Sequence, residues 1–140
     1  MTQPHVDELA HLLREFALSL VRDAPQGPLS RVAAATLSVL ERQGPQRVTA
    51  LAERESVTQP AMTGLVQRLE ASGLVVREAD PTDGRASIIS ITPVGSKELG
   101  ARREAHDDAI AARLGQLSGY DRAMLAAALP AITHLTESHV

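Results

Sequence analysis

The chain has no cysteine and no tryptophan, and only one phenylalanine and one tyrosine among its 140 residues. Without cysteine, disulfides, thiolate metal sites, cysteine nucleophiles and thiol redox sensing are excluded. No apolar run approaches the roughly 18 residues of a membrane-spanning helix, and the first residues lack the basic stretch, apolar block and cleavage site of a secretory signal. We therefore expect a cytoplasmic protein with no membrane association.

A surplus of positive charge is also lacking, because 14 basic and 17 acidic side chains give a formal net charge of −3. Binding to nucleic acid therefore requires basic groups that are gathered on one face of the molecule. Lys97 is the single lysine, and the other basic residues are arginines. Arginine can make bidentate contacts to phosphate or guanine, although its abundance beside alanine is equally expected from genomic base composition.

The motifs of common enzyme classes are absent from the sequence. It has no Gly-rich phosphate loop, no serine in a nucleophile elbow and no carboxylate pair placed with a base, so we expect no enzymatic activity and no cofactor. A metal site needs two or more ligands on one face, whereas the adjacent His106 and Asp107 point about 100° apart on a helix. We interpret these residues and His11 as parts of solvated helix faces.

The length fits a single domain over residues 1–140. Leucines three and four residues apart predict an amphipathic helix over residues 7–21. Ser30 and Thr58 are expected N-caps of two further helices, which end near residues 43 and 71. A short helix over residues 49–54 is expected between them.

The apolar period changes after Gly73. Residues 74–76 and 86–91 are short runs rich in β-branched side chains, on either side of a polar stretch at residues 80–85. This arrangement predicts one β-hairpin with a polar tip.

Two further helices are expected after the hairpin. Thr92 is a candidate cap for a long helix whose first residue, Pro93, has no N–H to leave unsatisfied. Ser118 and Asp121 resemble a capping box and open a last helix. Pro130 is expected to kink that helix.

A short helix, a tight turn, a well-capped helix and a hairpin follow one another in the order of a winged helix-turn-helix. We therefore expect a mainly α fold with a small β-hairpin wing, its lobe spanning residues 30–92. The helices at residues 5–23 and 93–140 carry more apolar surface than a core of this size needs. We expect them to serve as dimerisation helices that clasp a second copy about a two-fold axis.

Six motifs follow one another between residues 48 and 95. They are Thr49-Ala50-Leu51-Ala52, Gln59 to Glu70, Gly73-Leu74-Val75, Arg77, Asp80 to Arg85, and Ile91 to Gly95. In this order and spacing they resemble the multiple antibiotic resistance regulator (MarR) family of bacterial transcription factors, and the match extends over nearly the whole chain. The resemblance implies a homodimeric repressor that binds a pseudo-palindromic operator in double-stranded DNA and is released by a small, often aromatic or phenolic, effector.

The expected major-groove surface is the outward face of the helix that Thr58 caps. It comprises Gln59, Pro60, Ala61, Thr63, Gly64 and Gln67. A solvated face is usually rich in Glu and Lys, whereas short neutral side chains allow close approach to base edges, with Gln suited to adenine and Thr to the thymine methyl. Gly64 departs from the family, which often has a basic or hydroxyl side chain there, and costs about 1 kcal/mol of helix stability relative to Ala.

Asp83, Gly84 and Arg85 form the expected wing tip. Arg85 can enter a narrow minor groove, where the negative potential is strongest, and Asp83 is expected to hold its guanidinium by a bidentate pair. The alternative is a solvent-exposed arginine beside an incidental aspartate.

The expected contacts to the DNA backbone come from residues around the turn and the first wing strand. They are Arg54, Ser56, Thr58, Arg68 and Arg77. Arg77 can contact phosphate or brace the hairpin, and the sequence leaves both roles open. The arrangement requires three acidic residues, Glu53, Glu55 and Glu70, to turn away from DNA.

The resemblance further implies an effector cleft, which would include His11, Arg14, Phe16 and Arg42. The scarcity of aromatic residues leaves few of the aromatic walls that are common in such pockets. A second function class stays open, because the acidic net charge also permits a winged helix that binds protein and has no specific DNA site. A steep loss of affinity with salt would distinguish DNA binding from this alternative.

Overall fold

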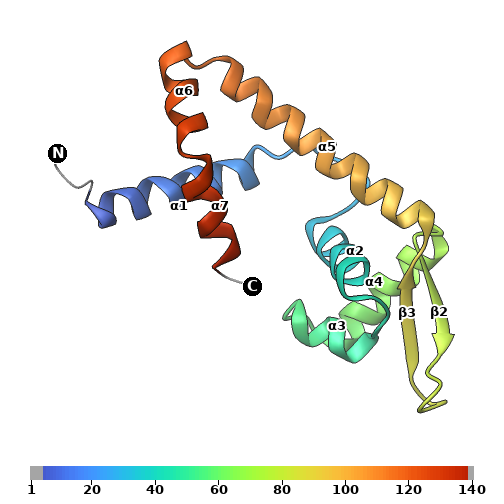
Figure 1. The fold of residues 1–140 in the computed structure, drawn as a ribbon. Coiled ribbons are helices and arrows are strands. Elements are labelled where there is room, and N and C mark those ends of the chain that lie inside the picture. Colours follow the sequence, from blue (N-terminus) through green and yellow to red (C-terminus); the bar gives the residue numbers. More distant parts are fainter. Residues whose placement is uncertain (1–4, 139–140) are drawn as a thin grey trace. The chain divides into compact units, whose positions relative to one another are not determined.

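The computed structural model describes residues 5–138, which fall into two compact units. One unit is Gln26–Ala105, and the chain up to Pro25 forms the other together with the residues from His106 onward. Figure 1 shows the order of the elements along the chain. They are α1 Val6–Arg22, α2 Arg31–Gln43, β1 Gln46–Arg47, α3 Val48–Arg54, α4 Gln59–Ala71, β2 Val75–Ala79, β3 Ser87–Ile91, α5 Pro93–Gly115, α6 Gly119–Ala127 and α7 Leu129–Glu137.

The structure confirms the expected fold class, a mainly helical chain with a small antiparallel sheet. The expected caps also form: Ser30 Oγ accepts a hydrogen bond from the Ala33 N–H at 3.1 Å, and Thr58 Oγ1 accepts one from the Ala61 N–H at 3.3 Å. Each cap satisfies an N–H that has no partner within its own helix. The starts of α2 and α4 are therefore set by local chemistry.

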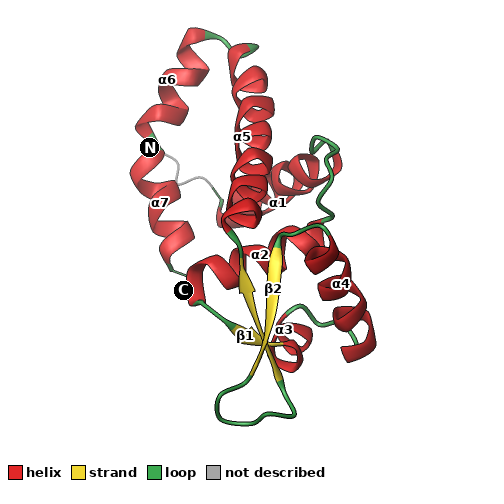
Figure 2. Cartoon of the chain, turned by 90° about the vertical axis from the view of Figure 1, so that its right-hand side faces the viewer, coloured by secondary structure: helices red, strands yellow, loops and turns green. Residues whose placement is uncertain are grey.

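The sheet has three strands in the order β1-β3-β2, and both pairings are antiparallel. The predicted hairpin is confirmed by the pairing of β2 with β3. Strand β1, in which Gln46 and Arg47 pair with Ile89 and Ile88, was not expected. A two-residue strand is too short to show an alternating pattern, so the sequence carried no signal for it. Figure 2 shows the loop between β2 and β3 extending beyond the paired strands.

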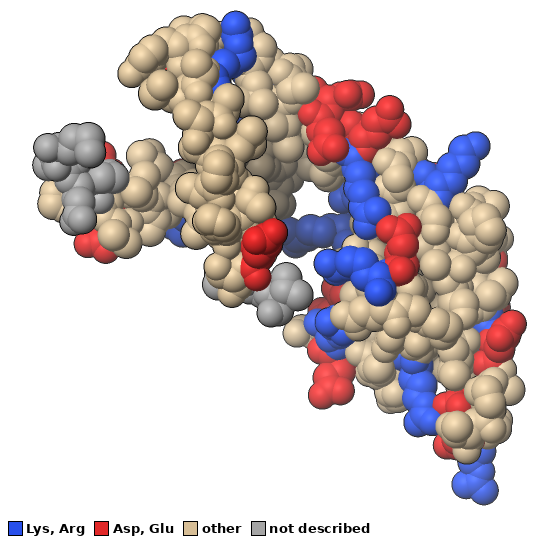
Figure 3. All heavy atoms as spheres, viewed as in Figure 1, with Lys and Arg blue, Asp and Glu red and all other residues tan. Residues whose placement is uncertain are grey.

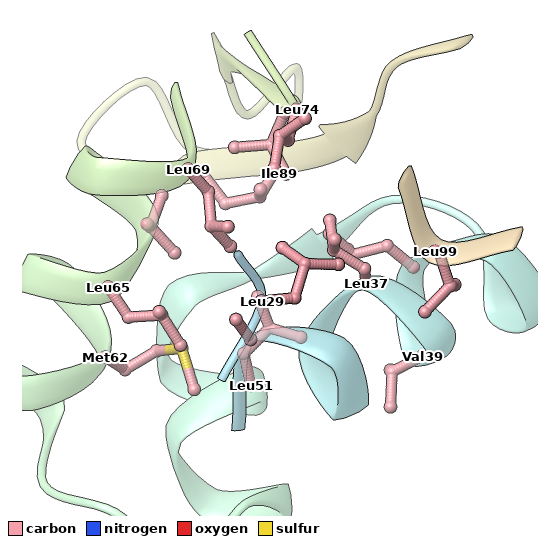
Figure 4. Close-up of a cluster of buried hydrophobic side chains, with 14 of the residues drawn as sticks. Leu29, Leu37, Val39, Leu51, Met62, Leu65, Leu69, Leu74, Ile89 and Leu99 are labelled. Carbon is pink, nitrogen blue, oxygen red and sulfur yellow. The ribbon is translucent and has the colours of Figure 1, made fainter. Parts of the chain in front are cut away.

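The core of the Gln26–Ala105 unit joins the inward faces of α2, α3 and α4 to the sheet (Figure 4). Leu37 of α2, Leu51 of α3, Met62 of α4 and Ile89 of β3 have no exposed surface. Their burial confirms the inward stripes expected from the apolar spacing. Removal of such side chains from water supplies most of the driving force for this packing.

The junction between the wing and α5 is held by side chain and backbone together. Thr92 Oγ1 donates to the Gly73 carbonyl at 2.6 Å and accepts from the Gly95 N–H at 3.0 Å. A β-carbon at Gly95 would clash with the Leu74 carbonyl oxygen and lie 2.8 Å from Ile91 Cγ1. The close approach of α5 to the α4–β2 turn therefore requires glycine at this position.

The first half of α5 is tied to α2 and to the residues before it. Arg102 Nη1 donates to the Leu29 carbonyl at 2.8 Å, and Arg103 Nη1 donates to the Glu41 carboxylate at 2.8 Å. The Arg103 hydrogen bond lowers the pKa of Glu41 from its ordinary value. These contacts make the start of α5 part of the Gln26–Ala105 unit.

The unit formed by the chain ends has a different surface, since α1, α6 and α7 contain no buried residue. Leu12, Leu129 and Leu135 are each more than half exposed. The expected last helix is divided into α6 and α7, because Pro130, without an N–H, stands in the first turn of α7. Of residues 5–138, no helix has the length and apolar content needed to cross a membrane.

Ser118 caps α6 in part as expected. Its Oγ accepts from the Asp121 N–H at 3.0 Å, which is one half of a capping box. The Asp121 carboxylate accepts from the Ser118 hydroxyl at 2.6 Å, whereas in a full capping box it would accept from the backbone. The shorter side chain of aspartate, compared with glutamate, accounts for the difference.

Candidate nucleic-acid interface

Helix α4 turns one face to the core and the other to solvent. Met62, Val66 and Leu69 lie in the core. Of the residues expected to face a major groove, Gln59, Pro60, Ala61 and Gln67 are exposed and Thr63 and Gly64 are half-buried. The structure thus leaves the uncharged surface of α4 accessible.

The turn between α3 and α4 is compact. Ser56 adopts a left-handed backbone with φ of 52°, uncommon for a residue other than glycine. The Val57 N–H donates to the Ala52 carbonyl at 3.0 Å and closes the turn. Thr58 Oγ1 acts as acceptor in the cap and keeps its hydroxyl hydrogen for a further partner.

One groove gathers residues from α4, the start of α3 and the wing. Gln59 and Thr63 line it from α4, while Arg77 and Arg85 line it from the wing. Four residues that the sequence assigned to DNA contact therefore meet on one surface, although 26 positions separate Gln59 from Arg85 in the sequence. Arg47, Val48 and Thr49 also line this groove, and the sequence analysis missed them.

The wing tip differs from the expectation in one contact. Asp83 Oδ1 accepts a hydrogen bond from the Arg85 backbone N–H at 3.1 Å. The expected bidentate pair with the Arg85 guanidinium is wrong, because an aspartate side chain reaches the N–H two residues ahead more readily than a mobile guanidinium. Asp83 thus shapes the turn, and Arg85 is exposed at its tip.

Asp80 is the residue that holds the wing to the rest of the lobe. Its side chain is 4% exposed and is ion-paired with Arg47, whose Nε donates to Oδ2 at 2.6 Å. Its Oδ1 accepts from both the N–H and the hydroxyl of Thr82 at 2.8 Å. The Thr82 hydrogen bonds are the main cause, and Arg47 a further one, of an Asp80 pKa below the ordinary value.

The signal for this cluster was weak in the sequence. Asp80 belongs to a motif at the hairpin tip, but Arg47 precedes it by 33 positions. Only the pairing of β1 with β3 brings the two residues together. No local pattern could have assigned Asp80 a partner on another element.

The expected backbone contacts lie in different settings. Arg77 lines the groove, and its Nε lies 3.8 Å from the Glu70 carboxylate. Arg54 is exposed and donates from Nη1 to Gln43 Oε1 at 2.5 Å. Ser56 and Arg68 are also exposed but are not among the residues that line this groove.

Charges of both signs are interspersed over the face of the molecule shown in Figure 3. A basic side chain projects at the end where Figure 1 places the loop between β2 and β3. No acidic residue is among those that line the groove, although the chain as a whole is acidic. The local concentration of arginine is what DNA binding by an acidic protein requires.

The residues expected at an effector cleft are placed as follows. On α1, the Arg14 guanidinium lies 3.4 Å from His11 Nδ1, and the Phe16 ring lies 5.5 Å from the guanidinium carbon of Arg113. Arg42 belongs to α2 in the other unit, where its Nε donates to the Ser38 carbonyl at 3.4 Å. The structure thus gives each of these four residues a separate local setting.

A small cavity in the unit of the chain ends contains His106. It is lined by Leu20, Asp23, Ala24, Pro25, His106, Ala109, Ile110 and Arg113. The interpretation of His106 as part of a solvated face is wrong, because its Nε2 is buried and makes no hydrogen bond within the described residues. Among those residues, no group of three or more His, Asp or Glu side chains is placed to hold a metal ion.

A helix with an accessible uncharged face, beside a wing that carries arginines, defines a winged helix-turn-helix DNA-binding protein. The MarR family profile matches residues 29–87. An HTH-type transcriptional regulator of Mycobacterium leprae is 32% identical over 139 residues, which cover 94% of this chain and 97% of that protein. The chain therefore belongs to the MarR family and is a DNA-binding transcriptional regulator.

The chain is also similar to two further proteins. The transcriptional repressor NicR of Pseudomonas putida is 30% identical over 99 residues, covering 68% of this chain and 63% of NicR. The crystal structure of the transcriptional regulator Tm0710 from Thermotoga maritima superposes with a TM-score of 0.76 at 24% identity, covering 94% of this chain and 96% of Tm0710. The fold is therefore shared along nearly the whole chain.

Proposed function

We propose that the protein is a homodimeric repressor that binds a pseudo-palindromic operator. The observation that carries this proposal is the single groove that Gln59, Thr63, Arg77 and Arg85 line together. An uncharged helix face and a basic wing on one surface can engage adjacent grooves of a duplex. The relative NicR is named a repressor, and a dimer seated on an operator blocks access of polymerase.

Base reading is assigned to α4. The exposed Gln59 can form a bidentate pair with adenine, and Thr63 can contact a thymine methyl. Pro60, Ala61 and Gly64 add no long side chain, so the helix backbone can approach the bases closely, and Gln67 extends the same face by one turn.

The wing is assigned to the minor groove. Arg85 is exposed at the tip, and Asp83 and Gly84 form the turn that presents it. Arginine is favoured in a narrow minor groove because its potential is more negative. Arg54, Ser56, Thr58, Arg68 and Arg77 are proposed as phosphate contacts around these two elements.

The dimer is assigned to the chain ends. The lobe is proposed to span residues 30–92, and the helices at residues 5–23 and 93–140 to form the dimer interface, of which residues 139–140 lie outside the described part. More than ten large apolar side chains of α1, α6 and α7 are exposed in the single chain. Apolar surface of this extent is typical of an interface between subunits.

A small aromatic or phenolic effector is proposed to release the DNA. His11, Arg14, Phe16 and Arg42 remain the candidate ligand residues. The Arg113 guanidinium already lies over the Phe16 ring, so an aromatic ligand that stacks on that face of Phe16 would have to displace it. Titration calorimetry with salicylate as a probe, on the wild type and on Phe16→Leu, tests this part of the proposal.

The main test is binding of the purified protein to fragments of its own upstream region, measured by fluorescence anisotropy between 50 and 200 mM salt. We expect selective retention over unlabelled competitor DNA and a steep loss of affinity with salt, since each neutralised phosphate contributes a slope of about −0.9. Footprints should show two half-sites about one helical turn apart. Affinity without salt dependence or selectivity would favour a winged-helix protein-interaction module.

Base reading by α4 is tested separately with two variants of its exposed face. Gln59→Ala and Thr63→Ala should reduce affinity for the selected fragment more than for a mixed-sequence duplex, because base contacts carry the sequence information and phosphate contacts do not. An equal loss on both duplexes would contradict base reading by α4.

A further inference from the structure

The groove between α4 and the wing contains more arginine than the expected contacts account for. Arg47 of β1, Arg77 of β2 and Arg85 of the wing loop come from three separate elements. The hydroxyl-bearing Thr49, Thr63 and Ser87 line the same groove. Guanidinium and hydroxyl groups are the donor set that binds phosphodiester oxygens. Two carboxylates, Asp80 and Glu70, lie near Arg47 and Arg77 but are not among the residues that line the groove.

We propose that this groove seats one sugar–phosphate strand of the duplex, and that Arg47 is a phosphate ligand which Asp80 positions. The proposal rests on the proposed function, in which α4 and the wing enter neighbouring grooves. Two neighbouring grooves of a duplex are separated by a backbone strand, so that strand must pass between α4 and the wing. Arg47 lies on the surface where it passes.

The contacts of Arg47 prepare it for this role. Its side chain is 46% exposed, while the Asp80 side chain is 4% exposed. Nε and Nη2 face Asp80 and Thr82. Nη1, the other terminal nitrogen, makes no hydrogen bond in residues 5–138. A guanidinium held on one edge loses little freedom when its other edge binds phosphate.

Asp80 has a corresponding role as a positioning residue. Its buried carboxylate joins β1 to the wing loop through Arg47 and Thr82. The Asp80 carboxylate is therefore shielded from solvent and in contact with Arg47. Loss of this carboxylate would leave Arg47 charged but no longer fixed in direction.

The first experiment measures, for Arg47→Gln, the slope of the logarithm of the binding constant against the logarithm of the salt concentration. We expect the magnitude of this slope to fall by about one unit. The fall should be the same on the upstream fragment and on a 30-base-pair mixed-sequence duplex. The matched control is Arg31→Gln, because Arg31 is exposed on α2 and is not among the groove residues. An unchanged slope in Arg47→Gln, or an equal fall in Arg31→Gln, would overturn the assignment.

The second experiment uses the sign of the effect of Asp80→Asn. Electrostatics alone predicts tighter binding, because a negative charge near DNA is removed. The positioning role predicts several-fold weaker binding, and no further change when Asp80→Asn is added to Arg47→Gln. Tighter binding, or the same fold-loss in both backgrounds, would show that Asp80 does not act through Arg47.

Folding is checked by thermal unfolding, since Arg47→Gln leaves a buried carboxylate without its cation. If this variant is unfolded at the assay temperature, the double variant Arg47→Gln/Asp80→Asn is compared with Asp80→Asn, and the same fall of about one unit in slope is expected.

The binding data distinguish an error in the groove assignment from an error in the proposed operator binding. If the wild type binds its upstream fragment selectively and Arg47→Gln keeps the full slope, the groove assignment alone is wrong. If the wild type binds every duplex equally, the operator proposal is wrong, while the slope of Arg47→Gln still tests the groove. If the wild type binds no duplex, both are wrong.

Discussion

The Gln26–Ala105 unit and the unit formed by the chain ends treat their apolar residues differently. The first unit encloses fifteen buried hydrophobic residues in one cluster. In the second, α1, α6 and α7 have strong apolar faces but bury no residue. The same helical spacing therefore corresponds to an internal core in one region and to an exposed apolar surface in the other.

This difference in apolar burial implies that the two units are stabilised in different ways. The lobe can be stable by itself, because its apolar surface is removed from water within one chain. In the proposed dimer the chain ends would reach comparable burial, and their stability would then depend on protein concentration.

Leu37→Ala should destabilise the lobe by about 2–5 kcal/mol, because it opens a cavity at a site with no exposed surface. The measurement is urea denaturation followed by circular dichroism. The same truncation at Leu18 of α1, which is 51% exposed, should cost much less. Equal losses at the two positions would show that the lobe is not the separately stabilised region.

Leu129→Asp should dissociate the dimer, because it places a charge within the apolar face of α7, where Leu129 is 59% exposed in the single chain. Sedimentation velocity at micromolar concentration should show a monomer. His134→Asp, on the opposite face of α7, should remain dimeric. A wild-type chain that is monomeric under these conditions would contradict the role given to the chain ends.

Gly95→Ala should cost about 1–3 kcal/mol, since the added β-carbon clashes with the Leu74 carbonyl oxygen and the backbone must shift. Gly100→Ala is the matched control in the same helix, because a β-carbon there meets nothing within 4 Å. That variant should gain up to about 1 kcal/mol from helix propensity. Thermal unfolding of both variants measures the difference.

Arg85→Ala should leave the fold unchanged and weaken operator binding by about 1–3 kcal/mol, because the exposed wing tip loses its guanidinium. Anisotropy titration measures the binding, and circular dichroism checks the fold. Wild-type affinity in this variant would remove the wing tip from the interface.

The smallest effect is a dependence of stability on pH at Asp80. Its pKa is lowered in the folded protein, so its contribution is complete above the unfolded value of about 3.9. The contribution is lost as pH falls through the lowered folded value. The stability difference between wild type and Asp80→Asn should therefore be constant at neutral pH and should shrink below about pH 4 in acid titrations.

Local chemistry explains why much of the lobe was predictable. The caps at Ser30, Thr58 and Thr92 and the apolar stripe of α4 act over three or four residues, and the structure confirms them. The outward face of α4 followed from the same stripe. Contacts between distant residues were not predictable in this way, and the pairing of Arg47 with Asp80 is the clearest example.

Two expected side-chain settings were wrong for different reasons. Asp83 was expected to hold the Arg85 guanidinium but instead bonds its backbone N–H. His106 was expected in solvent, yet its Nε2 is buried beside the end of α1. For Asp83, the competition among available hydrogen-bond partners is decided only after the chain has folded. For His106, packing near Leu20 removes Nε2 from solvent without giving it a partner within the described residues.

The amino-acid sequence by itself determined the helices, their caps, the wing and the family, because each depends on short-range spacing or on an ordered set of motifs. Only the tertiary structure decided that Arg47 joins the groove, that Asp80 holds it, and that Gly95 permits α5 to approach the α4–β2 turn. These features depend on strand pairing and close packing, which bring together residues that no local interaction connects.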